Sequence, residues 1–263
     1  MRSVLPTMRK LWGSIPRRAS SCRSAPWYTA PASKRPSCTA ARTASAVEEL
    51  AAEIRDGGGR AVGVATDIAS AADCARLVDV ALAEFGAIDV LVNNAFRGPS
   101  FKLFEEEDLE SWRRVFDVNV FGSLQLTQRV VPFMKARGGS IVFINTMSTR
   151  IIEERAGAYA SSKGALLIAA QTLAKELGRY RIRVNSVVPG YIWGKAVERY
   201  FIILAGEQGR TPEEVYDDIA GQTALNYIPT SAEIADAVLF FASDLSRVVT
   251  GQALDVNGGH FFH

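Results

Sequence analysis

Short runs of apolar, mostly β-branched residues alternate with longer amphipathic segments along most of this chain. Continuously apolar runs are typical of strands that are buried on both faces of a parallel sheet. Strands that are regularly followed by helices predict an α/β fold with a doubly wound parallel sheet. The expected strands cover residues 62–66, 88–92, 141–144, 182–188 and 253–259, and the expected helices cover residues 44–57, 71–86, 108–137, 158–174 and 231–243.

Residues 139–163 place a strand, a turn rich in hydroxyl groups and a helix in succession. On that helix Tyr159 and Lys163 are four residues apart, so both side chains project from one face. A nearby ammonium favours the phenolate, and we therefore expect the pKa of Tyr159 to lie below its usual value. Thr146, at the end of the strand, has a hydroxyl that can bond the same substrate oxygen. Such a pair on a helix is usually just solvated, but directly after a buried strand it indicates an acid/base site.

Six stretches stand out in the chain: Asp67-Ile68, the run LVNNA at 91–95, Asn119 within DVNVFG, YASSK at 159–163, RVNSVVPG at 183–190 and TGQALDVNGG at 250–259. Together they resemble the short-chain dehydrogenase/reductase family, from about residue 42 to the end of the chain. The resemblance implies a single Rossmann-like domain over residues 41–263. It also implies an enzyme, an NAD(P)-dependent oxidoreductase that interconverts a carbonyl and a secondary alcohol by hydride transfer.

The resemblance gives four residues a catalytic role. Tyr159 exchanges the proton, Lys163 lowers the pKa of Tyr159 and holds the cofactor ribose, Thr146 fixes the substrate oxygen, and Asn119 orders a water that relays protons. For Asn119 the alternative is a contact that stabilises a kink, because a buried asparagine must be hydrogen-bonded. The family generally has serine where Thr146 stands, and Ser148 is the alternative hydroxyl, although it is two residues too close to Tyr159.

The resemblance also implies a set of cofactor-binding residues. Arg42, just after the position at which the family has its second strand, can meet a 2′-phosphate and so favours NADP over NAD. Asp67 either caps the following helix or holds the adenine amino group, and the motif set favours the adenine contact. Phe96 stands where the family usually has glycine. The implied residues are Arg42, Asp67, Ile68, Asn93, Ala95, Tyr159, Lys163, Pro189, Gly190 and Ile192.

The segment 193–229 is rich in aromatic and aliphatic residues and corresponds to the part that caps the substrate in this family. Its apolar character, interrupted by Gly206 and Gly209, predicts a lid over an apolar small-molecule alcohol or ketone. By resemblance we expect a homodimer or a homotetramer.

Composition excludes several other classes. The three cysteines have no paired or CxxC spacing, which indicates a reduced compartment and no metal site. No apolar run is long enough to span a membrane. We therefore expect a cytoplasmic protein that binds neither membranes nor nucleic acid.

The first 40 residues do not fit this pattern. The first 47 residues hold nine Lys and Arg and no Asp or Glu, and show neither helical nor strand periodicity. They resemble a transit peptide or a basic arm for nucleic acid. They also occupy the place of the family's glycine-rich cofactor turn, and they contain no GxxxGxG pattern. We therefore favour an out-of-frame or misassigned start, with the first βαβ unit missing or disrupted. The rival hypothesis is a catalytically impaired relative that lost dinucleotide binding and acts as a binding or structural module.

Overall fold

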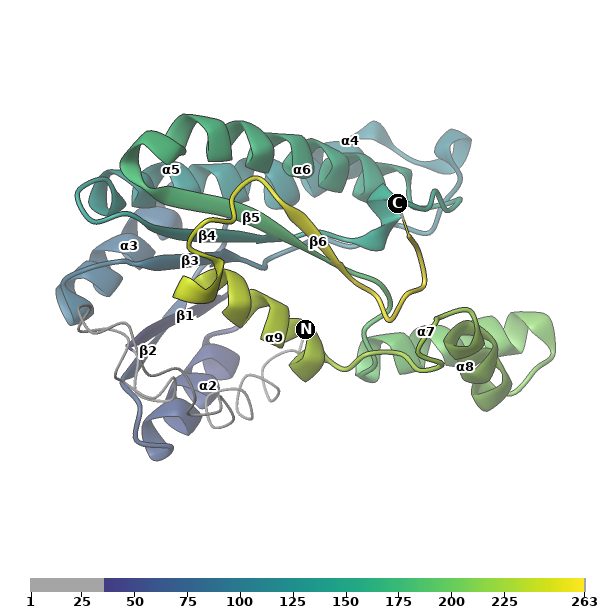
Figure 1. Ribbon diagram of the computed structural model, residues 1–263. Helices are drawn as coiled ribbons and strands as arrows, with labels where there is room; N and C mark the ends of the chain where they lie inside the picture. Colours follow the sequence, from purple (N-terminus) through teal and green to yellow (C-terminus); the bar gives the residue numbers. More distant parts are fainter. Residues whose placement is uncertain (1–35, 263) are drawn as a thin grey trace.

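The computed structural model of the protein describes residues 36–262, so most of the expectations for residues 1–40 lie outside the described residues. The strands are β1 (Ser37–Ala41), β2 (Ala61–Ala65), β3 (Val90–Asn93), β4 (Gly139–Ile144), β5 (Ile182–Pro189) and β6 (Ala253–Val256). The helices are α2 (Ala44–Asp56), α3 (Ala71–Phe85), α4 (Leu109–Phe116), α5 (Ser123–Met134), α6 (Gly157–Leu177), α7 (Lys195–Gln208), α8 (Pro212–Gly221) and α9 (Ser231–Ala242). The expected alternation of strands and helices is therefore present (Figure 1).

All strand pairs among the described residues are parallel. Strands β3, β4, β5 and β6 form one sheet in that order, and β1 and β2 form a second pair. No strand in the described part of the chain joins β1 to β3 by hydrogen bonds. The parallel α/β sheet agrees with the sequence, whereas the expected disruption of the first βαβ unit concerns residues outside those described.

Regular structure begins earlier than the boundary that we expected at residue 40. Ser37–Ala41 forms β1, which pairs in parallel with β2. The Thr39 hydroxyl lies 3.3 Å from the carbonyl oxygens of both Val47 and Val62, which ties the strand to α2 and β2. The small and hydroxylic residues of this strand concealed it, because strand patterns are recognised from β-branched and aromatic residues.

The core lies on both faces of the larger sheet. In β4, Ile141 and Phe143 face the cluster formed with α3, α5 and α6, whereas Val142 faces α9. Alternate residues of a strand point to opposite faces, so the buried centre of this strand needs apolar residues at successive positions. Figure 1 shows α5 and α6 above the sheet and α9 below it. Val64 of β2 and the partly buried Cys38 of β1 join the first cluster, so both sheet parts share one core.

Candidate active site

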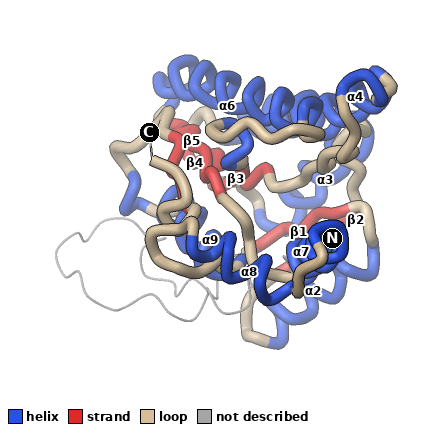
Figure 2. The backbone as a smooth tube through the Cα atoms, turned by 90° about the vertical axis from the view of Figure 1, so that its right-hand side faces the viewer, coloured by secondary structure: helices blue, strands red, loops and turns tan. Residues whose placement is uncertain are grey.

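The carboxyl ends of β3, β4 and β5 lie at one edge of the sheet, because the strands are parallel and in register. Figure 2 views the molecule from the side of α7 and α8 and shows these strands below α6. Asn93, Thr146 and Pro189 stand at or just after the strand ends. This is the edge at which open α/β sheets bind their ligands.

Tyr159 reaches this edge from the first turn of α6. Its side chain lies beside that of Thr146. Burial raises the pKa of Tyr159 above its usual value, and the Thr146 hydroxyl opposes that rise only in part. The expectation of a lowered tyrosine pKa is therefore wrong for this structure, because loss of hydration outweighs any favourable charge. Tyr159 is a protonated phenol at neutral pH.

Lys163 lies one turn further along α6 and is 2% exposed. Its Nζ donates a hydrogen bond to the carbonyl oxygen of Ile144, the last residue of β4, at 2.7 Å. Burial lowers the pKa of Lys163 to about 8. The helix and the strand therefore place an ammonium of reduced pKa beside the tyrosine.

Phe96 covers this pair from the loop after β3. Its ring centroid lies 6.2 Å from that of Tyr159, and Lys163 Nζ lies 5.9 Å from the Phe96 ring. These separations are within the range of aromatic and cation–π contacts. A glycine, which the family usually has here, could make neither contact.

Asn119 lies in a π-helical turn, Asp117–Gly122, between α4 and α5, where the sequence predicted a continuous helix. The side chain is fully buried. Its Oδ1 accepts from the backbone N–H of Arg97 at 2.7 Å, and its Nδ2 donates to the Arg97 carbonyl at 3.1 Å and to Ser162 Oγ at 2.9 Å. These contacts favour the kink-stabilising alternative for the side chain, since both amide hydrogens are used. A relay water would have to bind other atoms of this turn.

Two residues without an assigned role in the sequence complete the acid/base neighbourhood. Ser162 Oγ donates to the Tyr159 carbonyl at 2.7 Å and so joins Asn119 to the catalytic helix. Asn145 directly precedes Thr146, and its Nδ2 donates to Ser186 Oγ at 3.2 Å. Ser162 lies in the run YASSK and Asn145 in the segment 139–163, which was the available signal, but the side chains they bond, Asn119 and Ser186, are distant in sequence.

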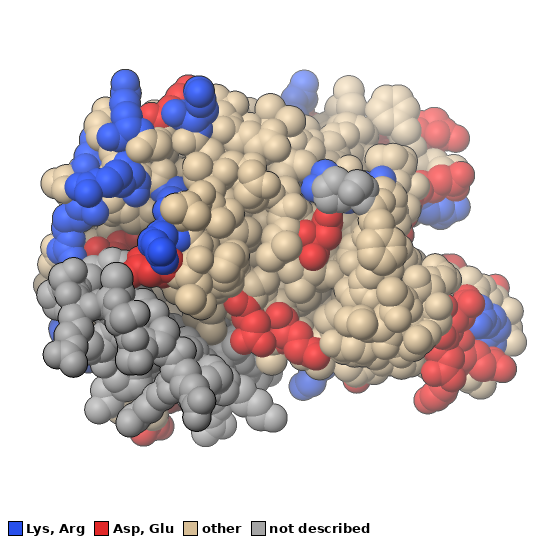
Figure 3. Space-filling view, viewed as in Figure 1, with Lys and Arg blue, Asp and Glu red and all other residues tan. Residues whose placement is uncertain are grey.

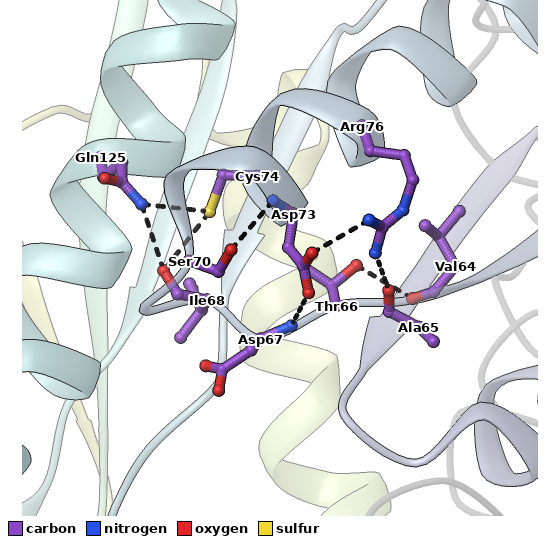
Figure 4. Close-up of polar contacts among 10 residues, drawn as sticks. All are labelled: Val64, Ala65, Thr66, Asp67, Ile68, Ser70, Asp73, Cys74, Arg76 and Gln125. Atoms are coloured by element: carbon purple, nitrogen blue, oxygen red, sulfur yellow. Dashed lines mark hydrogen bonds and ion pairs between the residues drawn. The ribbon is translucent and has the colours of Figure 1, made fainter.

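The β2–α3 loop carries Asp67 and Ile68 at the adjacent end of β2 (Figure 4). The helix cap is Ser70, whose side chain accepts from the backbone N–H of Asp73. Asp67 Oδ1 accepts from Ala69 N at 3.0 Å, and Asp67 N donates to the Asp73 carboxylate at 2.8 Å. In Figure 4 the Asp67 carboxylate points away from Asp73. Asp67 is therefore not the helix cap, which leaves its second oxygen for another partner.

The structure distributes the other predicted cofactor residues along the same edge. Asn93 is buried and donates to Thr127 Oγ1 at 3.1 Å, while its Oδ1 has no partner among the described residues. Ala95 is exposed on the loop after β3, and Arg42 is exposed directly after β1. Beyond β5 the chain places its last three predicted residues, Pro189, Gly190 and Ile192, of which Ile192 packs toward α9.

The donor set fits two ends of a nicotinamide dinucleotide. Lys163 uses one N–H for Ile144, so two remain for ribose hydroxyls, and Tyr159 adds a further hydroxyl. Asp67 offers a carboxylate oxygen suited to the adenine amino group. The β1–α2 turn contains Arg42 and Thr43 and no glycine, so among residues 36–262 it supplies no glycine-rich cradle for the diphosphate.

Helices α7 and α8 form a unit with its own small core, centred on residues such as Phe201, Val215 and Ile219. In Figure 1 the two helices project beyond the sheet edge. Acidic side chains gather on this end of the face in Figure 3, in accord with the four acids of α8. The segment predicted as a lid is thus an amphipathic pair of helices near the strand ends.

An aromatic row connects this lid to the body of the protein. The Tyr200 ring of α7 stacks between Phe101, at 6.0 Å, and Tyr191, at 6.4 Å. Tyr191 stacks in turn on His260 at 6.1 Å and donates to Glu153 Oε1 at 3.4 Å. Burial raises the pKa of both tyrosines. Rings from three other segments therefore connect α7 to the body of the protein.

Other chemistry finds little support in the described part of the chain. Cys38 and Cys74 are free, and burial raises the pKa of both thiols, that of Cys38 to about 11. Residues 36–262 contain no cluster of three metal-binding side chains. None of the described helices has the length and hydropathy needed to cross a bilayer.

Comparison with known proteins gives consistent matches. The family model described as enoyl-(acyl carrier protein) reductase matches residues 37–260. The 7α-hydroxysteroid dehydrogenase of Escherichia coli K12 is 33% identical over 217 residues, which cover 82% of this chain and 80% of that protein.

Two solved structures are similar at the level of the whole fold. An NAD+-bound xylitol dehydrogenase has a TM-score of 0.79 and 28% identity, covering 85% of this chain and 88% of that one. A single-residue variant of an actinorhodin polyketide ketoreductase with NADPH also has a TM-score of 0.79 and 28% identity, with coverages of 85% and 86%.

Proposed function

Because this chain belongs to the short-chain dehydrogenase/reductase family, we propose that it uses a nicotinamide dinucleotide to interconvert a carbonyl and a secondary alcohol. The observation that carries the proposal is the position of Tyr159 beside Thr146, with the buried Lys163 one turn further along α6. A protonated phenol next to a second hydroxyl is suited to a carbonyl oxygen.

The proposed mechanism divides the reaction between hydride and proton. When bound, the reduced nicotinamide supplies a hydride to the carbonyl carbon. Tyr159 transfers its hydroxyl proton to the carbonyl oxygen, so the C=O double bond becomes a C–OH single bond. Thr146 hydrogen-bonds the same oxygen, and Lys163 stabilises the phenolate that remains until solvent returns the proton. In alcohol oxidation Tyr159 accepts the proton instead.

Cofactor binding is assigned to the residues that line the sheet edge. Tyr159 and Lys163 would hold the nicotinamide ribose. The backbone from Pro189 to Ile192 would line the nicotinamide ring. Asp67 and Ile68 would hold the adenine. Asn93 and Ala95 belong to the end of β3 and the loop after it, and would contact the cofactor from there. Arg42, exposed beyond β1, supports NADP over NAD, because a guanidinium suits a 2′-phosphate.

The apolar core of α7 and α8 supports a lid over an apolar alcohol or ketone. We further propose that the protein is cytoplasmic and acts as a homodimer or homotetramer. The similarity to a hydroxysteroid dehydrogenase is in keeping with an apolar substrate.

The test is a titration of the full chain with NADH and with NADPH, followed by nicotinamide fluorescence. We expect binding of both, with NADPH favoured, and loss of that preference in Arg42→Ala. The matched control is Arg179→Ala, which changes an exposed arginine stacked on Tyr180. A folded chain that binds neither cofactor would overturn the proposal and favour the impaired relative that lacks dinucleotide binding.

A further inference from the structure

We propose that Phe96 is a positioning residue, which covers the acid/base pair and keeps water from Lys163 and Tyr159. The inference deepens the proposed function and depends on it for its catalytic meaning. The contact geometry itself is independent of any cofactor or substrate.

The cover is made by one ring that touches both members of the pair. The Phe96 centroid is 6.2 Å from the Tyr159 centroid with the planes inclined at 58°, and 5.9 Å from Lys163 Nζ. Phe96 itself is 45% exposed, whereas Lys163 is 2% exposed. The ring therefore contacts the pair while part of its own surface remains in solvent.

The loop that carries Phe96 is fixed at two points after the ring. Directly after it, the backbone N–H and carbonyl of Arg97 are both bonded to the fully buried Asn119. Further along, Phe101 stacks on Tyr200 of α7 at 6.0 Å. Phe101 has a φ of 59°, which is rare for a bulky residue and is maintained only by its surroundings. The anchored loop holds the ring in place.

The consequence is chemical. An apolar ring removes water from the ammonium, which disfavours its charged form, while its π-face returns a smaller cation–π attraction. Burial is the cause of the lowered pKa of Lys163. Two titratable residues neighbour this contact. Tyr159 lies one turn before Lys163 on α6, and Arg97 follows Phe96 in the loop. Uncovering the pair would hydrate both groups and return the two pKa values toward their usual levels.

The experiment is a pH titration of Lys163 in the full chain without cofactor, by the Cε resonance of ¹³C-labelled lysine assigned with Lys163→Met. In Phe96→Ala we expect the pKa of Lys163 to rise by about one unit, which is a tenfold change in its protonation equilibrium. Phe96→Leu retains an apolar cover and should stay close to the wild type. Phe133→Ala is the matched control, because it removes a ring of similar exposure, 47% against 45%, from α5 and leaves the Phe96 loop unchanged.

An unchanged or lowered Lys163 pKa in folded Phe96→Ala would overturn the inference, and so would a rise of the same size in Phe133→Ala. Turnover of cyclohexanol with oxidised cofactor provides a separate readout. We expect Phe96→Ala to lower kcat more than it raises KM, because a positioning residue acts on the pair and not on substrate affinity. Absence of turnover in the wild type would count against the proposed function, while the resonance would still decide the role of Phe96.

Discussion

Lys163 is held by the backbone of the neighbouring strand: its ammonium donates to the Ile144 carbonyl at 2.7 Å. Ile144 ends β4, two residues before Thr146, so one hydrogen bond joins the catalytic helix to the strand that positions the second hydroxyl. A carbonyl orients an ammonium without neutralising it. The charge remains available to the site, and the protein bears the cost of burying it.

That cost predicts an unusual pH dependence of stability. The pKa of Lys163 is about 8 in the folded protein, against a usual value of 10.5. Between these values the unfolded chain binds more protons, so the contribution of Lys163 to stability rises with pH from about 8 to 10.5. Below pH 8 both states are protonated and the full penalty, about 3 kcal/mol, is present.

Lys163→Met should therefore be more stable than the wild type at pH 7, by about 2 kcal/mol once the lost hydrogen bond is subtracted. The advantage should shrink as the pH approaches 10.5. Urea unfolding at pH 7 and pH 10 measures both. Lys175→Met, an exposed change on the same helix, is the control. Equal stability differences at the two pH values would contradict a buried, charged Lys163.

Replacing Tyr159 with phenylalanine should lower turnover by about 10²- to 10⁴-fold, because the proton donor is lost while the ring that contacts Phe96 is kept. Far-UV circular dichroism and the unfolding midpoint should show a retained fold. Tyr180→Phe removes a hydroxyl from a tyrosine that lies beyond α6, and it should leave turnover unchanged. Activity of Tyr159→Phe within tenfold of the wild type would exclude the assigned role.

Asn119→Leu should destabilise the protein by about 3 kcal/mol, since it leaves the Arg97 N–H and carbonyl and the Ser162 hydroxyl without their buried partner. Hydrogen exchange at the Arg97 amide should accelerate more than the average amide. Asn94→Ala, at an exposed position of the same loop, is the control. A loss below about 1 kcal/mol would mean that the loop is held by other contacts.

The fold was largely predictable because its signals are local. Strands such as β5 are continuous apolar runs, and helices such as α3 have a polar cap and a glycine stop, so their bounds were expected to within one or two residues. The π-helical turn at Asn119 was not predicted. One extra residue hardly disturbs helical spacing, and the Arg97 backbone that fixes the turn lies 22 residues away in sequence.

The placement of the candidate residues on shared elements was predictable, whereas their electrostatics were less so. The spacing of Tyr159 and Lys163 correctly placed them on one helix, and Thr146 contacts Tyr159 as its position suggested. The direction of the tyrosine pKa shift was wrong, because a sequence shows which charges are near but not how much water is removed. Phe96 illustrates the same limit, since its contacts with both residues depend on the path of an irregular loop.

The space around Gly122 and Gly164 predicts opposite effects on stability when each is replaced with alanine. A Cβ at Gly122 would lie 2.8 Å from the Ile68 carbonyl oxygen, which already accepts from Cys74 and Gln125 and so cannot easily recede. Gly122→Ala should cost about 1–3 kcal/mol and weaken cofactor binding through the displaced loop. A Cβ at Gly164, within α6, would meet open space, so Gly164→Ala should stabilise by about 0.5–1 kcal/mol. Urea unfolding of both variants shows whether their changes in unfolding free energy have opposite signs. A stabilised Gly122→Ala would show that the loop is free to move.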